Sequence, residues 1–220
     1  MPKAVLLDLD GTLVDSTEAH AVSWQRAFQR HGYEVPLERL RRWIGMGGDK
    51  LLPQVNPALR EETEPGKSIA ALRGELFMKD WLPRLKPTNG ARALLERIGE
   101  EKLLRVIASS AQADEVKALL EVAGLSDVVD ITTNSDEVDR SKPDPDVVSK
   151  ALDKAHTRPE EAAYLGDTPY DVTAAHRAGV IAIGIACGAW DAVELRDAQA
   201  VYRDPAELVR SFDASPLRNP

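Results

Sequence analysis

Two carboxylates at the end of an apolar run are the residues of this chain best suited to chemistry. Asp8 and Asp10 follow the run at residues 4–7 and precede Gly11 and Thr12. If the extended conformation continues, both side chains lie on one face, because alternate residues of a strand point the same way. Carboxylates are rarely buried without a cation. The pair predicts a Mg²⁺ site and a carboxylate able to act as a nucleophile.

A calcium-binding loop is the alternative interpretation of an Asp-x-Asp-Gly segment. Such a loop needs further oxygen ligands and a closing glutamate, bracketed by two helices. Here a strand-like run precedes Asp8, and no such ligand series follows Gly11. The sequence therefore favours the end of a buried strand.

Two further apolar runs, at 103–108 and 162–166, also end in polar residues. Those residues are Ser109 and Ser110 after the first run, and Asp167 and Asp171 after the second. Parallel strands open their carboxyl ends on one edge of a sheet, so we expect these side chains to meet Asp8. Taken singly, Ser109 is typical of a helix N-cap and Asp171 of a helix start.

Lys142 lies in the stiff segment Ser-Lys-Pro-Asp-Pro at 141–145. The prolines on either side of Asp144 restrict the backbone and can aim the lysine reproducibly. A lone lysine is more often a solvated surface residue, so its interpretation depends on the other three segments.

The elements that must position these residues alternate along the chain. The predicted strands lie at 3–8, 103–108, 127–131, 162–166, 180–185 and 199–203. The predicted helices lie at 87–99, 112–123, 145–155, 171–178 and 205–212. This alternation predicts an α/β fold with a Rossmann-like, mainly parallel sheet.

A long insert without a convincing strand interrupts the alternation. Helical patterns lie at 17–31, 36–43 and 58–79, with irregular Gly- and Pro-bearing joints at 45–57. We therefore expect a helical cap domain at 16–85 and a core domain formed by 1–15 and 86–220. The tail at 214–220 has little apolar content, and we expect it to be frayed.

Composition narrows the classes of function. Of the 220 residues, 43% are hydrophobic, which supports an ordinary globular core. The formal net charge of −8 argues against a nucleic-acid partner. No apolar run is long enough to span a membrane, and no signal-like segment is evident. The single cysteine, Cys187, fits a reducing compartment, so we expect a cytoplasmic protein and no membrane partner.

The four polar segments together resemble the haloacid dehalogenase-like superfamily, specifically members with a helical cap. The matching residues are Asp8-Leu9-Asp10-Gly11-Thr12-Leu13-Val14-Asp15-Ser16, Ser109, Lys142 with Pro143, and Gly166-Asp167-Thr168-Pro169-Tyr170-Asp171. The resemblance covers nearly the whole chain. It implies a phosphatase that forms an aspartyl-phosphate with Mg²⁺ as cofactor.

The resemblance also implies roles for several of these residues. Asp8 would be the nucleophile and Asp10 the acid and base, while Lys142 would neutralise charge. Ser109 would bind the phosphoryl oxygens together with backbone groups at Gly11 and Ser110. Mg²⁺ would be held by Asp8, the Asp10 carbonyl and Asp167, with Asp171 in support.

The insert is expected to close over the site and select the leaving group. Candidate substrate-binding residues are His20, Gly47 and Lys50; His20 lies four residues before Trp24 on one helix face. A core tryptophan with a partly exposed histidine, or a plain helix–helix turn at the glycines, explains the same residues equally well.

β-Phosphoglucomutases of the family offer the main alternative function, sugar phosphomutase. They carry an arginine in the cap loop, and Gly48 occupies that place here. The difference favours hydrolysis, although Arg41 and Arg42 precede the loop and could compensate. A phospho-accepting signalling domain or a non-catalytic phospho-ligand binder is a weaker alternative, because both would lack an equivalent of Asp10.

The predicted function is therefore hydrolysis of a small-molecule phosphate ester, of the sugar phosphate or phosphoglycolate type. A monomer is sufficient for this mechanism, and a weak homodimer is equally compatible with it.

Overall fold

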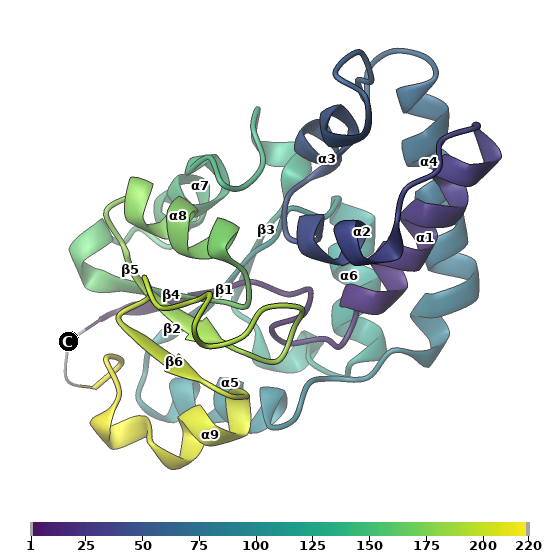
Figure 1. The fold of residues 1–220 in the computed structure, drawn as a ribbon. Helices are drawn as coiled ribbons and strands as arrows, with labels where there is room; N and C mark the ends of the chain where they lie inside the picture. The colour runs from purple at the N-terminus through teal and green to yellow at the C-terminus, as the bar shows by residue number, and fades with distance from the viewer. Residues whose placement is uncertain (1, 219–220) are drawn as a thin grey trace.

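The computed structural model describes residues 2–218, which fold around one six-stranded parallel sheet. The strand order is β3-β2-β1-β4-β5-β6 (Figure 1). The strands are β1 (Ala4–Leu7), β2 (Leu104–Ala108), β3 (Ile131–Thr133), β4 (Ala162–Gly166), β5 (Ile181–Ile185) and β6 (Ala200–Tyr202). The predicted α/β fold with a parallel sheet is confirmed.

Helices cover both faces of the sheet. One face carries α5 (Ala91–Glu100), α6 (Ala113–Val122) and α9 (Pro205–Arg210), and the other carries α7 (Asp146–Lys154) and α8 (Pro169–Arg177). In β1, Val5 and Leu7 belong to the first apolar layer, whereas Ala4 and Leu6 belong to the second. Burial on both faces explains why the strand sequences are continuously apolar.

The insert after β1 is helical and lies beside the sheet (Figure 1). It consists of α1 (Thr17–Arg30), α2 (Leu37–Trp43), α3 (Gly48–Val55) and α4 (Gly66–Leu76), followed by single turns at Phe77–Trp81 and Leu82–Arg84. These helices enclose their own apolar cluster, which includes Trp24, Phe28 and Leu40. We call this segment the cap; its exact division from the core at 15/16 and 85/86 stays a prediction.

Four local predictions differ from the structure. Helix α3 occupies part of the expected irregular joints, because Leu51 and Leu52 are fully buried and their packing outweighs the unfavourable Gly and Pro residues. Helix α4 begins at Gly66 rather than at 58, and β3 starts where the predicted strand at 127–131 ends. The tail predicted to be frayed at 214–220 packs as far as Leu217, which is fully buried, and its last two positions lie outside the described residues.

No helix among residues 2–218 combines the length and the apolar character needed to cross a membrane.

Candidate active site

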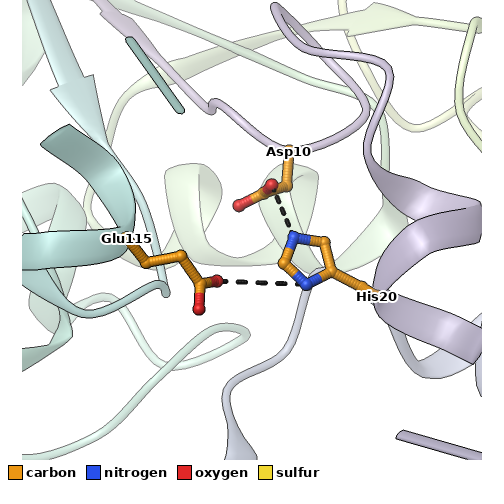
Figure 2. A group of neighbouring side chains, drawn as sticks. All are labelled: Asp10, His20 and Glu115. Carbon is orange, nitrogen blue, oxygen red and sulfur yellow. Dashed lines mark hydrogen bonds and ion pairs between the residues drawn. The ribbon is translucent and has the colours of Figure 1, made fainter. Parts of the chain in front are cut away.

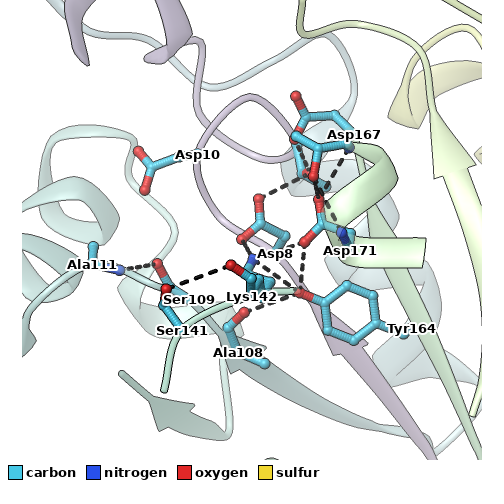
Figure 3. A network of polar contacts seen from close by, with 12 residues as sticks. Asp8, Asp10, Ala108, Ser109, Ala111, Ser141, Lys142, Tyr164, Asp167 and Asp171 are labelled. Carbon is cyan, nitrogen blue, oxygen red and sulfur yellow. Dashed lines mark hydrogen bonds and ion pairs between the residues drawn. The ribbon is translucent and has the colours of Figure 1, made fainter. Parts of the chain in front are cut away.

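The register of the sheet brings the predicted polar residues to one edge. Leu7 pairs with Ile107 of β2 and with Leu165 of β4. The residues that follow these strands, Asp8, Ser109 and Asp167, therefore emerge at the same edge, and each side chain is buried (Figure 3).

Lys142 is the centre of the charge network at this edge (Figure 3). Its Nζ atom lies 2.5 Å from Asp8 Oδ1, 2.7 Å from Asp171 Oδ1 and 3.1 Å from the Tyr164 hydroxyl. Burial opposes the charged amine, but the carboxylates of Asp171 and Asp8 outweigh it and hold the pKa of Lys142 well above its usual value. A permanently positive charge thus lies beside Asp8.

The carboxylates in this network outnumber its one cation, Lys142. Ligand oxygens of Asp8, Asp167 and Asp171 lie within 4.8 Å of one another. Burial, with the neighbouring carboxylates adding to it, raises the pKa of Asp8 to about 7 and that of Asp167 well above its usual range. One lysine does not balance three buried acids, so this donor set fits a hard divalent cation that prefers oxygen ligands.

The backbone leaves room for an ion beside Asp167. A Cβ atom added at Gly11 would lie 2.3 Å from Asp167 Oδ2, and one added at Gly188 would lie 1.8 Å away. Gly11 also has φ +80°, a conformation that residues with a Cβ rarely adopt. Asp171, by contrast, is already engaged, since its second oxygen accepts hydrogen bonds from the Thr168 amide and hydroxyl at 3.0 and 2.6 Å.

Asp10 lies in a separate hydrogen-bonded group with cap residues (Figure 2). Its Oδ1 atom accepts a hydrogen bond from Ser16 Oγ at 2.6 Å and lies 2.8 Å from His20 Nε2. Burial disfavours the charged carboxylate, yet His20 and Ser16 together lower the pKa of Asp10 below its usual value. The His20 ring also stacks on Phe77, with 4.0 Å between centroids, which fixes its orientation.

A cavity of about 50 Å³ lies between these two groups and the cap. Ser109 and Ser110 form part of its wall; Ser109 Oγ accepts a hydrogen bond from the Ala111 amide at 3.0 Å. The buried Ser110 Oγ has no hydrogen-bond partner among residues 2–218. A free hydroxyl in this wall is available to a phosphoryl oxygen.

Not every predicted substrate-binding residue reaches the cavity. His20 and Gly47 line it together with Ser110. Gly11 does not line it, and its amide donates to the Val14 carbonyl at 2.8 Å. Lys50 is also absent from the wall, because its amine forms an ion pair with Asp144 at 2.7 Å.

Three residues of the site were not predicted. Tyr164 lies in the apolar run of β4, and its hydroxyl contacts Lys142 and Asp171; a buried tyrosine needs such a partner, which was the available signal. Glu115 and Arg73 line the cavity. Glu115 stands four residues before Leu119, on the apolar face of its helix, whereas nothing in the local sequence distinguishes Arg73.

Polar contacts hold the cap against the core. Arg42 Nη1 lies 3.0 Å from Glu194 Oε2, and the Arg42 guanidinium lies 3.5 Å from the centre of the Trp190 ring. Ser141, next to Lys142, accepts a hydrogen bond from the Gly47 amide at 3.0 Å and donates to Asp49. The loop that carries Lys142 is therefore also a docking point for the cap.

Comparisons with known proteins identify relatives that match this chain over most of its length. A family model described as haloacid dehalogenase-like hydrolase matches residues 5–185. Validoxylamine A 7'-phosphate phosphatase of Streptomyces hygroscopicus subsp. limoneus is 28% identical over 94% of this chain and 96% of its own length. A phosphoglycolate phosphatase of Aquifex aeolicus is also 28% identical, over 96% and 97% of the two chains.

A solved structure is similar over almost its entire length. The crystal structure of a hydrolase from Pseudomonas syringae has a TM-score of 0.89 and 28% identity, covering 97% of this chain and 99% of its own.

Proposed function

Because the chain belongs to the haloacid dehalogenase-like hydrolase family, we propose that it is a Mg²⁺-dependent phosphatase of small phosphorylated metabolites. The observation that carries the proposal is the position of Asp8, buried at a strand end 2.5 Å from Lys142, with a second acid, Asp10, in the same cavity wall. A nucleophile, a fixed cation and an acid or base are the groups that phosphoryl transfer through an enzyme ester requires.

In this mechanism, Asp8 attacks phosphorus and forms an aspartyl-phosphate as the alcohol leaves. Asp10 gives a proton to the leaving oxygen and later takes one from the water that hydrolyses the ester. Its hydrogen bonds to Ser16 and His20 hold the carboxyl group in place for both steps. Ser109 and Ser110 bind phosphoryl oxygens, and Lys142 neutralises their charge.

Asp8, the Asp10 carbonyl and Asp167 would hold Mg²⁺, with Asp171 supporting the site through Lys142. When bound, the ion supplies positive charge to the phosphoryl oxygens and to the nucleophile. The excess of buried carboxylates beside Lys142 supports this assignment.

Hydrolysis is favoured over phosphomutase activity. A mutase must hold a second phosphate, and Gly48 stands where the related mutases carry an arginine. A Cβ atom added at Gly48 would lie 1.9 Å from Glu61 Oε1, so a carboxylate occupies the place a phosphate-binding side chain would need. We further propose a cytoplasmic enzyme with no nucleic-acid or membrane partner, for which a monomer is sufficient.

Phosphate release from p-nitrophenyl phosphate, with Mg²⁺ or with EDTA, tests the proposal. We expect metal-dependent release that Asp8→Asn abolishes, because the variant keeps the shape of the side chain and loses the nucleophile. Asp15→Asn is the matched control, since Asp15 is exposed in the same loop and should leave the rate unchanged. Absence of release by the wild type on any phosphate ester would overturn the proposal.

A further inference from the structure

A buried charge pair forms part of the cavity wall and takes no part in the proposed phosphoryl transfer. Arg73 extends from cap helix α4 and Glu115 from core helix α6, with 2.7 Å between Arg73 Nη1 and Glu115 Oε2. Their side chains are only 15% and 8% exposed. A buried ion pair contributes little net stability after desolvation, so its place in the wall points to binding.

The pair has unused hydrogen-bonding capacity of both kinds. Arg73 Nε is a buried donor with no hydrogen-bond partner in the described chain. Glu115 Oε1 forms a long ion pair with His20 Nδ1, at 3.9 Å and beyond hydrogen-bond distance, and can still accept a hydrogen bond (Figure 2). A hydroxyl group can accept from Arg73 and donate to Glu115, whereas a carboxylate or phosphate group can only accept.

The charges around the cavity do not favour a second anion. Among the described residues that line it, the lysine and arginine side chains are Lys142, which faces Asp8, and Arg73, which Glu115 neutralises. Nearby cap cations are also paired: Lys50 with Asp144 and Arg42 with Glu194. An anionic leaving group would meet the Glu115 carboxylate without an unpaired cation to balance it.

Building on the proposed phosphatase function, we propose that Glu115 is a specificity-determining residue that admits esters of neutral, polyhydroxylated alcohols. Sugar-like polyols satisfy both Arg73 and Glu115, while leaving groups that carry a carboxylate or a second phosphate are rejected. Side-chain atoms of Asp10, His20 and Glu115 lie within 4.8 Å of one another, so a leaving group that receives its proton from Asp10 lies close to Glu115.

Glycerol 1-phosphate and 3-phosphoglycerate test the proposal, because they differ mainly by a hydroxymethyl group in place of a carboxylate. We expect kcat/KM to favour the glycerol ester by at least about tenfold, since the carboxylate of 3-phosphoglycerate would lie beside the like charge of Glu115. Glu115→Gln should reduce this preference by about tenfold, chiefly by lowering the KM for 3-phosphoglycerate. Glu121→Gln, an exposed change on the same helix, should leave the preference unchanged.

The outcomes separate the two proposals. If the wild type hydrolyses 3-phosphoglycerate as well as the glycerol ester, the role of Glu115 is overturned while the phosphatase stands. The same conclusion follows if a folded Glu115→Gln enzyme keeps the wild-type preference. If neither these esters nor p-nitrophenyl phosphate is hydrolysed, the proposed function itself fails. The comparison of the two esters with the wild-type enzyme tests the proposal even if Glu115→Gln does not fold.

Discussion

Asp167 is a buried carboxyl group whose ionisation costs free energy in the folded chain. Burial and the charges of Asp8 and Asp171 raise its pKa well above the ordinary 3.8. For an acid with a raised pKa, stability is lost as the pH rises above the ordinary value, because only the unfolded chain ionises easily. Bound Mg²⁺ should restore that stability by balancing the negative charge.

Asp167→Asn should therefore stabilise the metal-free protein and remove its response to Mg²⁺. We expect a rise in Tm of at least about 2 °C at neutral pH, since 1 kcal/mol corresponds to about 2–4 °C in a chain of this size. The difference from the wild type should grow between pH 4 and pH 7 in thermal unfolding with EDTA. A variant that Mg²⁺ stabilises as much as the wild type would contradict the metal assignment.

The Tyr164 hydroxyl joins the sheet to the charge network. It donates to the Ala108 carbonyl at 3.1 Å and lies 3.1 Å from Asp171 Oδ1. Tyr164→Phe should destabilise the protein by about 1–2 kcal/mol, because the buried Ala108 carbonyl and Asp171 carboxylate each lose a hydrogen-bond partner. Urea unfolding measures this, with Tyr202→Phe on the outer strand β6 as the control. Equal free energies of unfolding for the two variants would show that the Tyr164 hydroxyl does not stabilise the protein.

The sequence predicts the residues that follow β1, β2 and β4 because parallel strands must open on one edge. Asp8, Ser109 and Asp167 could be placed from that rule alone. Arg73 and Glu115 could not be paired in advance, because their contact depends on how the cap packs against the core. Neither α4 nor α6 has a local sequence pattern that indicates this packing.

At the scale of elements, the start of helix α8 supports the site. Thr168 and Asp171 form a reciprocal N-terminal cap, and Asp171 Oδ1 also contacts Lys142 at 2.7 Å. The predicted helix start at Asp171 missed only the first two helical residues, Pro169 and Tyr170. One carboxylate therefore caps the start of the helix and contacts Lys142.

Thr168→Ala should cost about 1 kcal/mol of stability, the usual loss for an N-cap hydroxyl. It should also lower kcat several-fold, because Asp171 loses a partner that fixes it against Lys142. Thr173→Ala, in the same helix, is the control; its hydroxyl donates to the Pro169 carbonyl. Urea unfolding and p-nitrophenyl phosphate turnover are the measurements. Unchanged turnover in Thr168→Ala would show that the N-terminal capping of α8 does not contribute to catalysis.

The sequence predicts elements well where a continuous apolar run has clear ends, and poorly where packing decides. The boundaries of β4 and β5 lie within one residue of the prediction. Helix α3 was missed because Gly47, Gly48 and Pro53 suggest a loop, while the burial of Leu51 and Leu52 stabilises a helix.

At the scale of the whole molecule, charged contacts set the position of the cap. Arg42→Met should remove the pair with Glu194 and raise the KM for p-nitrophenyl phosphate about two- to fivefold, since a partly exposed ion pair contributes up to about 1 kcal/mol. Added salt should raise the wild-type KM in the same direction and affect the variant less. Arg39→Met, an exposed change on the same helix, is the control. A salt-insensitive wild-type KM would contradict this role.

The stacking of Arg42 on Trp190 joins a cap cation to a core aromatic ring, and this has an optical consequence. When the cap moves away, the indole loses its cover and becomes more hydrated, so its emission should shift to longer wavelength. Trp190→Phe would remove the contribution of this ring to the shift and leave Trp24, Trp43 and Trp81. The ring that helps to dock the cap would thus serve as a built-in fluorescent reporter, through which stopped-flow mixing could time each opening against the release of phosphate.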